Sequence, residues 1–135
     1  MIDIGATAEV GLEVRYADTA HALGALTEDT FPEVLATSRM IAMMELAAAK
    51  LLRPLLREGE LSVGVNVNVK HLAATPLGGR ARAVATYAGP EGKLHRFRVQ
   101  AYDDAGLIGE GQHTRAIILT ERLMAGAMKR KAGPQ

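Results

Sequence analysis

Glu45 is the residue whose surroundings first suggest chemistry. It is the only polar side chain between Met40 and Ala49, a run that is otherwise apolar. A helix that is apolar on every side is a buried helix, so we expect the Glu45 carboxylate to lie in the protein interior. Burying a lone ionised acid costs on the order of several kcal/mol, whereas a whole domain is stable by only about 5–15 kcal/mol. Glu45 must therefore be paired with a cation or serve in a reaction.

A buried carboxylate can take two roles in a reaction. Burial raises the pKa of a carboxylic acid toward the range in which it accepts a proton near neutrality. It can then activate a water molecule as a general base, or act as a nucleophile itself. The structural alternative is an ion pair with Arg39 or Lys50, which lie on neighbouring turns. The sequence leaves these roles for Glu45 open.

Thr37 and His71 are the other two residues whose types suit such a reaction. Thr37 lies near the start of the helix that carries Glu45, and its hydroxyl can orient a water molecule or a carboxylate. His71 lies at the end of an expected strand, where it can shuttle a proton or hold Glu45 in position. Both also have structural interpretations, because a threonine can cap a helix and a loop histidine can bond to the backbone.

The elements that position these residues follow from hydrophobic periodicity. Alternation with a period of two predicts strands over residues 6–16 and 62–71. Turn motifs bound three further predicted strands, residues 80–87, 94–102 and 107–119. Residues 18–28 have no period and are predicted to be a loop or lid. Thr30 and Glu33 have the spacing of a capping box, with Pro32 in the first turn. We therefore expect helical structure from Thr30 to about Leu56 with a break near residues 36–37, and a short helix over 121–129.

The order of these elements predicts an α+β hotdog fold over a single domain, residues 1–135. One strand, a long apolar helix and four strands joined by tight turns imply a curved antiparallel sheet wrapped around a central helix. The alternation over residues 62–71 puts Val67, Val69 and His71 on the face toward the helix. It puts Gly64 and the two asparagines, Asn66 and Asn68, on the opposite face.

Composition excludes several classes of protein. A net charge of +1 argues against a dedicated binder of nucleic acid or of a membrane surface. The chain has no cysteine, which excludes disulfides, thiolate catalysis and zinc–thiolate sites and fits a reducing compartment. No apolar run approaches the roughly 20 residues of a membrane span, and Met1–Val10 has no signal pattern. We expect a soluble cytoplasmic protein without a metal; three further histidines have no spacing typical of metal ligands and are predicted to be structural or at the surface, namely His21, His95 and His113.

Three separated motifs carry a resemblance to a known family. They are Thr37–Glu45, His71–Pro76 and Ile108–Ala116, with Phe31–Val34 preceding the first. At these intervals they closely resemble the fluoroacetyl-CoA thioesterase family of hotdog enzymes, over about residues 31–119. The resemblance implies an acyl-CoA thioesterase that hydrolyses a short-chain acyl-CoA to free acid and CoA, with fluoroacetyl-CoA-like substrates among the candidates. It also implies that Thr37, Glu45 and His71 are catalytic, with no cofactor beyond the CoA of the substrate.

The resemblance further implies three substrate-binding residues. Gly64 would lie beside the thioester, Arg115 would support the active-site end of the last strand, and Phe31 would match a gating aromatic residue. The segment Leu26–Phe31 is polar apart from its ends, where the founding enzyme of the family has a bulky apolar lid. The acyl group is therefore not fixed by the resemblance.

The sequence leaves two alternative functions to weigh, and its strand pattern predicts a homodimer. A hotdog enoyl-CoA hydratase or dehydratase would use Glu45 or His71 to move a proton, but the Asp-x-x-x-x-His hydratase pattern is missing. A non-catalytic acyl-CoA-binding protein is the second alternative. We expect a homodimer, because strand 62–71 is a valine-rich edge that would otherwise be an aggregation liability.

Overall fold

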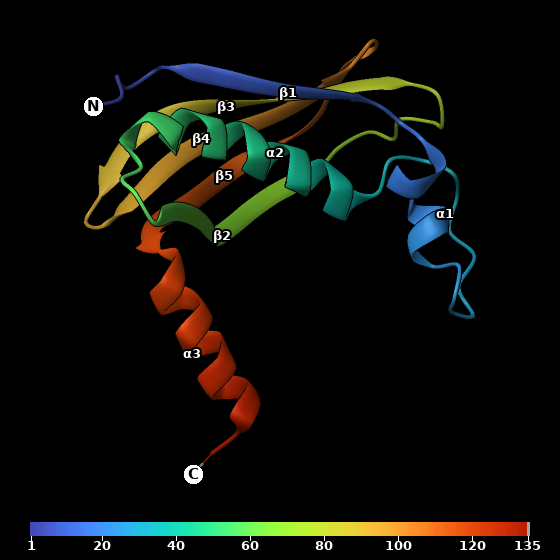
Figure 1. Cartoon of the computed structure of the whole chain (residues 1–135). Coiled ribbons are helices and arrows are strands. Elements are labelled where there is room, and N and C mark those ends of the chain that lie inside the picture. Colours follow the sequence, from blue (N-terminus) through green and yellow to red (C-terminus); the bar gives the residue numbers. More distant parts are fainter. Residues whose placement is uncertain (135) are drawn as a thin grey trace.

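A curled antiparallel sheet holds one long helix in its concave face (Figure 1). The computed structural model describes residues 1–134. The helix is α2 (Thr37–Leu52), and a 3-10 turn, η2 (Arg53–Leu55), follows it. The strands are β1 (Thr7–Glu13), β2 (Glu60–His71), β3 (Arg80–Glu91), β4 (Leu94–Asp103) and β5 (Gly106–Leu119). The predicted sheet around a central helix is confirmed.

The strand order is β1-β3-β4-β5-β2, which makes β2 an edge strand. Hairpins join β3 to β4 and β4 to β5 as predicted. The expected tight turn from β2 to β3 is wrong, because β2 pairs with β5 at the opposite side of the sheet. Leu72 donates to the Ile108 carbonyl at 2.7 Å, and Leu35 donates to the Thr75 carbonyl at 2.8 Å. These bonds hold the chain after β2 on a crossing path, so it reaches β3 without forming a hairpin.

The inner face of α2 packs on small side chains of the sheet. Alanines alternate along the facing strands, at positions 81, 83 and 85 of β3 and 101 of β4, and all are buried. From the helix, the buried residues are Met40, Met43, Met44, Ala47, Ala48 and Leu52. The outer face of α2 is open instead, with Leu46 51% exposed. The expectation that α2 is buried on every side is therefore wrong for the single chain.

The expected helical start at Thr30 is also wrong. α2 begins at Thr37, and its N-cap, Ala36, has extended backbone. The chain before it is extended because its backbone bonds elsewhere: the Val34 carbonyl accepts from Ala20 at 2.9 Å, and Ala36 donates to the Asp18 carbonyl at 2.9 Å. The predicted loop over 18–28 contains one short helix, α1 (Ala20–Leu23), and a 3-10 turn, η1 (Tyr16–Asp18), ends at its first residue.

A β-bulge in β2 changes which side chains face α2. The pairing register with β5 shifts between Gly64 and Asn66, so Val65 is the extra residue. A bulge reverses the alternation of faces along a strand. Val69 packs against the core as predicted, but Gly64 lies on the helix side, where a Cβ would meet the Glu45 carboxylate. The predicted placement of Gly64 on the outer face is therefore wrong.

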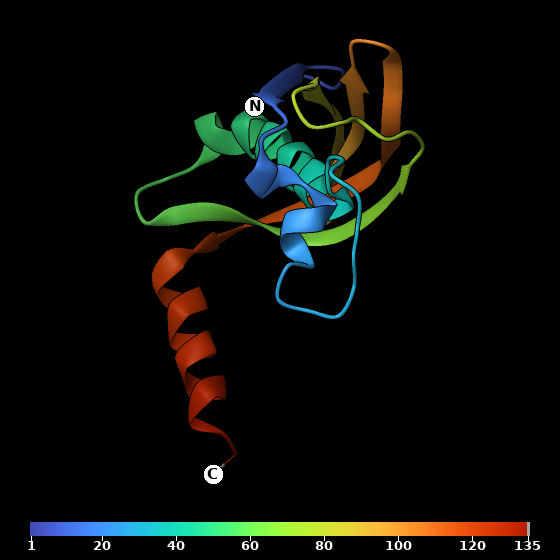
Figure 2. The same ribbon diagram turned by 90° about the vertical axis from the view of Figure 1, so that its right-hand side faces the viewer.

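The chain ends in a helix that leaves the body of the protein. This helix, α3 (Thr120–Ala132), extends the predicted element at both ends. It points away from the sheet and α2 (Figure 2). None of the side chains between Thr120 and Ala132 is buried. Among residues 1–134, no helix is long and apolar enough to cross a membrane.

Gly111 tests how closely β5 approaches β2. A Cβ there would collide with the Asn68 carbonyl oxygen and lie 2.6 Å from the Val69 Cα, both backbone atoms that cannot swing aside. Gly111→Ala should cost about 1–3 kcal/mol, lowering the Tm by roughly 4–12 °C in calorimetry. Gly11→Ala on β1 is the control, because its Cβ would make only an ordinary contact, 3.6 Å from the Ala81 carbonyl. Equal Tm values for the two variants would contradict this account.

Candidate active site

Thr37 and His71 meet at the N-terminal end of α2. Thr37 is the first residue of the helix, and His71 is the last residue of β2. The Thr37 Oγ1 and His71 Nδ1 atoms lie 2.8 Å apart. A hollow of about 330 Å³ opens here, which we call the Thr37 hollow. Its other lining residues are apolar: Ala20, Val34, Leu35, Leu72, Ala73 and Ala74.

The Thr37 hydroxyl forms a hydrogen bond with His71 and does not cap the helix. Ala36 occupies the N-cap position, with no side-chain cap bond. The capping interpretation of Thr37 is therefore wrong. Burial lowers the pKa of His71 below its usual 6.5, against a smaller opposing effect of the Ala73 backbone. The His71 Nε2 atom is buried and has no hydrogen-bond partner within residues 1–134. An imidazole of this kind is neutral at physiological pH and can exchange a proton with the threonine hydroxyl.

Glu45 lies about two turns further along α2, and its carboxylate is paired with the Arg115 guanidinium. The Arg115 Nη1 atom lies 3.2 Å from Glu45 Oε2, and the Glu45 side chain is 39% exposed. The prediction that this carboxylate lies in the interior is thus wrong for the single chain. The anticipated cations are engaged elsewhere, since Arg39 binds Asp18 at 2.9 Å and Lys50 donates to the Glu9 carbonyl at 2.8 Å.

Arg115 is buried and held by several acceptors at once. Its Nε donates to the Ser62 hydroxyl at 3.0 Å and its Nη2 to the Ser62 carbonyl at 2.8 Å. Its Nη1 lies 3.3 Å from His113 Nε2 as well as near Glu45. A guanidinium fixed on all sides presents one defined N–H direction to the carboxylate. Arg115, in the C-terminal half of β5, therefore orients Glu45.

His113 is a site residue that the sequence did not identify as one. Its Nδ1 lies 2.7 Å from the Asn66 carbonyl, so Nδ1 carries the proton and Nε2 accepts from Arg115. Burial lowers the pKa of His113, and Arg115 adds to this effect, while the Asn66 bond and Glu45 oppose it. The prediction of a structural histidine is confirmed in that it is buried. The available signal was its spacing of two from Arg115 on one strand, which puts both on one face.

Gly64 leaves the Glu45 carboxylate accessible. A Cβ at this position would lie 2.8 Å from Glu45 Oε2 and 3.3 Å from His113 Cε1. Any side chain would therefore press on the carboxylate. The structure thus brings Gly64, Glu45 and Arg115 together, with Ser62 and His113 behind them.

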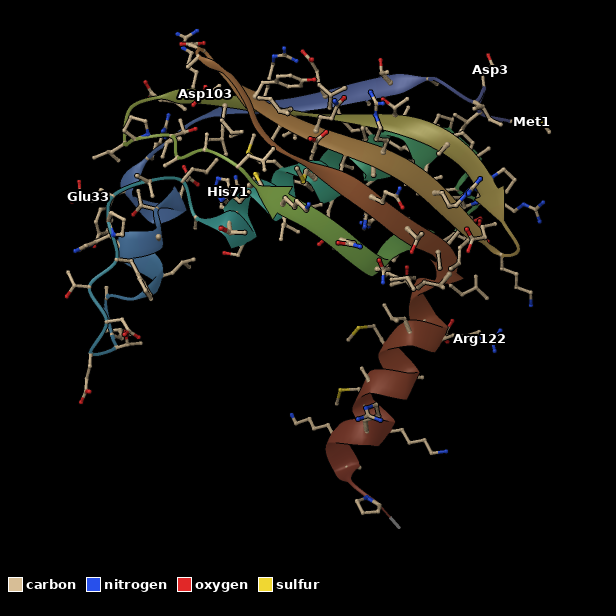
Figure 3. All side chains as sticks on the ribbon, turned by 180° about the vertical axis from the view of Figure 1, so that it is seen from behind. Met1, Asp3, Glu33, His71, Asp103 and Arg122 are labelled. Atoms are coloured by element: carbon tan, nitrogen blue, oxygen red, sulfur yellow. The ribbon has the colours of Figure 1, made fainter. Side chains whose placement is uncertain are left out.

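The predicted site residues form two groups and one outlier. Thr37 and Glu45 are little more than two turns apart on α2, about 12 Å along its axis, so the Thr37–His71 pair and the Glu45 group are separate in one chain. Phe31 is 45% exposed and is not in the wall of the Thr37 hollow. Its ring lies against Gly24, in the segment after α1. Figure 3 shows His71 at this end of the molecule, next to the loop that carries Glu33.

No group of three His, Asp or Glu side chains within residues 1–134 lies close enough together to hold a metal ion. The arrangement instead offers a hydroxyl paired with an imidazole, a helix N-terminus and an oriented carboxylate. These groups can bind and polarise a carbonyl group and move protons around it.

Comparison with known proteins defines the class. A curled antiparallel sheet around one helix is the hotdog fold, and solved hotdog-fold thioesterases, which are thioester hydrolases, share this fold. The solved structure of a fluoroacetyl-CoA thioesterase superposes with a TM-score of 0.89 at 33% identity, covering 99% of both chains. A Thermus thermophilus hypothetical protein, a thioesterase superfamily member, gives 0.87 at 33% identity, covering 98% of this chain and 95% of its own.

Sequence comparison narrows the class to a family. The sequence profile described as fluoroacetyl-CoA-specific thioesterase matches residues 14–121. The fluoroacetyl-CoA thioesterase of Streptantibioticus cattleyicolor is 41% identical over 95 residues, which cover 70% of this chain and 68% of that protein. The chain therefore belongs to the fluoroacetyl-CoA-specific thioesterase family, and the resemblance drawn from its motifs is confirmed.

His113 gives a pH-dependent test of the Arg115 group. Because burial lowers its pKa below 6.5, the folded protein excludes a proton that the unfolded chain binds below that pH. Its contribution to stability is full above pH 6.5 and is lost as the pH falls below it. His113→Gln should lower the Tm near pH 7.5, because it breaks bonds worth about 1–3 kcal/mol, yet show a smaller further decrease toward pH 5.5. A variant that loses stability with acid as steeply as the wild type would contradict this assignment.

Proposed function

We propose that the protein is an acyl-CoA thioesterase that hydrolyses a short-chain acyl-CoA to the free acid and CoA in the cytoplasm. The observation that carries the proposal is the 2.8 Å contact between Thr37 Oγ1 and His71 Nδ1 at the mouth of an apolar hollow. The Thr37 hydroxyl does not cap the helix, so a catalytic role is our explanation for its contact with the half-buried His71. Membership in a thioesterase family supports the same activity.

The Thr37–His71 pair would orient the attacking group and move protons. His71 is kept neutral by burial, so it can accept a proton from the threonine hydroxyl or from a water molecule. The positive end of the α2 dipole lies at Thr37, where the thioester oxygen would gain negative charge in the transition state. The apolar walls of the hollow suit a short acyl chain.

Glu45 would supply the base or the nucleophile. Arg115 fixes one of its oxygens, and Gly64 keeps the space beside the carboxylate free for the thioester. Either the carboxylate activates a water molecule, or it attacks the acyl carbon and the resulting anhydride is hydrolysed. Both routes consume one water molecule and release the acid and the CoA thiol. Phe31 would act as a gate, because it is exposed and lies three residues before Val34, which lines the hollow.

The site requires a second copy of the chain in this proposal. One chain keeps the Thr37–His71 pair about 12 Å along α2 from Glu45, and His71 Nε2 lacks a partner within residues 1–134. β2 is an open edge with Val65 54% exposed. Antiparallel pairing of β2 with β2 of a second copy would cover both edges. It would also set the His71 end of each strand beside the Glu60 end of the other, in the half of β2 that carries Gly64, so we propose a homodimer with shared sites.

The activity and the role of Glu45 are tested together. Wild-type protein should release CoA thiol, trapped with a thiol dye, from a panel that begins with acetyl-CoA and extends to longer chains. Glu45→Gln should lower kcat by about 10²–10⁴-fold, with a Tm within a few degrees of wild type, because the half-exposed carboxylate is replaced by a group of equal shape. Glu110→Gln, exposed on β5, is the matched control and should keep full activity.

Other outcomes of the same assay decide against the proposal. A wild-type protein that binds acyl-CoA and releases no thiol would be a binding protein or a hydratase. A Glu45→Gln variant that melts well below wild type yet retains its turnover would show that Glu45 has a structural role only.

The dimer has its own measurement. Light scattering at micromolar concentration should give twice the mass of one chain. Val65→Lys places a charge on the open edge of β2, which opposes strand pairing, and should shift the protein toward monomer with a parallel loss of turnover. A monodisperse wild-type monomer would contradict the shared site.

A further inference from the structure

α3 is a helix without a packing surface in its own chain. Its apolar side chains, Leu123, Met124, Ala127 and Met128, fall within an arc of about 140° on a helical wheel, and the two methionines and the leucine are exposed. Isolated helices of this length are marginal in water and need tertiary packing. The helix nevertheless runs regularly from Thr120 to Ala132, away from the body (Figures 1 and 2). Its apolar face therefore fits a surface that the single chain does not supply.

A second unpacked segment lies at the opposite end of β2. Leu23, Leu26 and Phe31, in and after α1, are all exposed, and Leu26 is fully so. The same segment carries Glu28 and Asp29. The last turn of α3 carries Lys129, Arg130 and Lys131. The two surfaces thus match in apolar character and are opposite in charge.

Within one chain these two surfaces are kept apart. α3 begins where β2 begins: Glu60 pairs with Leu119, and Thr120 donates to the Gly59 carbonyl at 2.9 Å. The Leu23–Phe31 segment lies beyond the His71 end of the same strand. Figure 3 shows this separation, with Arg122 of α3 at one end and His71 and Glu33 at the other. A 12-residue strand spans up to about 40 Å.

Antiparallel pairing of two β2 edges removes that separation. It brings the Glu60 end of one strand beside the His71 end of the other, so α3 of each copy starts next to the Leu23–Phe31 segment of the second copy. We infer that α3 is an arm that packs on the Leu23–Phe31 segment of the second copy and closes over its Thr37 hollow. This inference rests on the proposed dimer.

In this dimer, the Leu23–Phe31 segment and α3 of the second copy would together form a lid over the Thr37 hollow. Phe31 would be positioned by the apolar face of the arm, because its ring lies against Gly24 in its own chain yet stays 45% exposed. The arm would then affect substrate capture more than chemistry, since it touches neither Glu45 nor the Thr37–His71 pair. Weakening the arm should raise KM and leave the dimer formed through β2 in place.

Cross-linking tests the contact directly, because the chain has no cysteine of its own. Two double variants are made, Leu26→Cys with Met124→Cys and Leu26→Cys with Met128→Cys. Both should give covalent dimers with a short flexible bis-maleimide. The matched control is Leu26→Cys with Glu9→Cys, since Glu9 is exposed on β1 at the far edge of the sheet. The control should remain at the mass of one chain on a denaturing gel.

Activity supplies the second readout. Leu123→Ser, Met124→Ser and Met128→Ser together should lower kcat/KM roughly tenfold, mainly through KM, while light scattering still reports a dimer. Suppose that the wild type is a dimer, that the double variants cross-link no better than the control, and that the triple variant has unchanged kinetics. These results would overturn the arm and leave the proposed thioesterase intact. A monomeric wild type would overturn the proposed dimer itself. Binding of the wild-type protein to anionic phosphatidylserine vesicles, lost in the triple variant, would assign α3 to a membrane surface and overturn the arm too.

Discussion

Close packing of α2 on the concave face of the sheet sets the distances between the helix and the sheet residues of the site. The facing strands carry alanines under the helix, and β5 adds Gly109, where a Cβ would lie 2.6 Å from the Met40 sulfur. Larger side chains would push α2 outward, because protein interiors have no spare volume. The three buried methionines of α2 have flexible side chains, which pack on these small residues of the sheet. The helix therefore lies near enough to the sheet for Thr37 to reach His71 and for Glu45 to reach Arg115.

The second constraint is the burial of a permanent positive charge. The Arg115 guanidinium carries only N–H donors, so it must find acceptors inside the fold. Ser62, His113 and Glu45 supply them. This requirement explains why His113 must be neutral at Nε2 and why its Nδ1 proton is directed to the Asn66 carbonyl. It also keeps the Glu45 carboxylate in place although that residue is only half-buried, so a group available to substrate is still oriented.

The apolar surface left open by the single chain follows one pattern. The outer face of α2 at Leu46, the edge at Val65 and the apolar side of α3 are all exposed around β2. Exposed apolar groups that gather on one side of a small protein mark an interaction surface. An assembly through β2 would use that surface to unite the two groups of the site. Catalysis and association would then depend on the same strand.

The amino-acid sequence by itself determined the five strands, the central helix and the family. Alternation located two strands, because side-chain faces repeat locally every two residues, and turn residues bounded the other three. The spacing of three motifs identified the family and named Thr37, Glu45 and His71 as candidate site residues, since each motif is contiguous in the chain. Tertiary structure decided what depends on distant partners. Glu45 meets Arg115, 70 residues away, instead of Arg39 or Lys50. α2 begins at Thr37 because backbone bonds from Ala20 and Asp18 hold the preceding residues extended, against the local capping signal. The bulge at Val65 turned Gly64 toward the helix, and no local pattern marks such a shift, because it arises from the register between two strands.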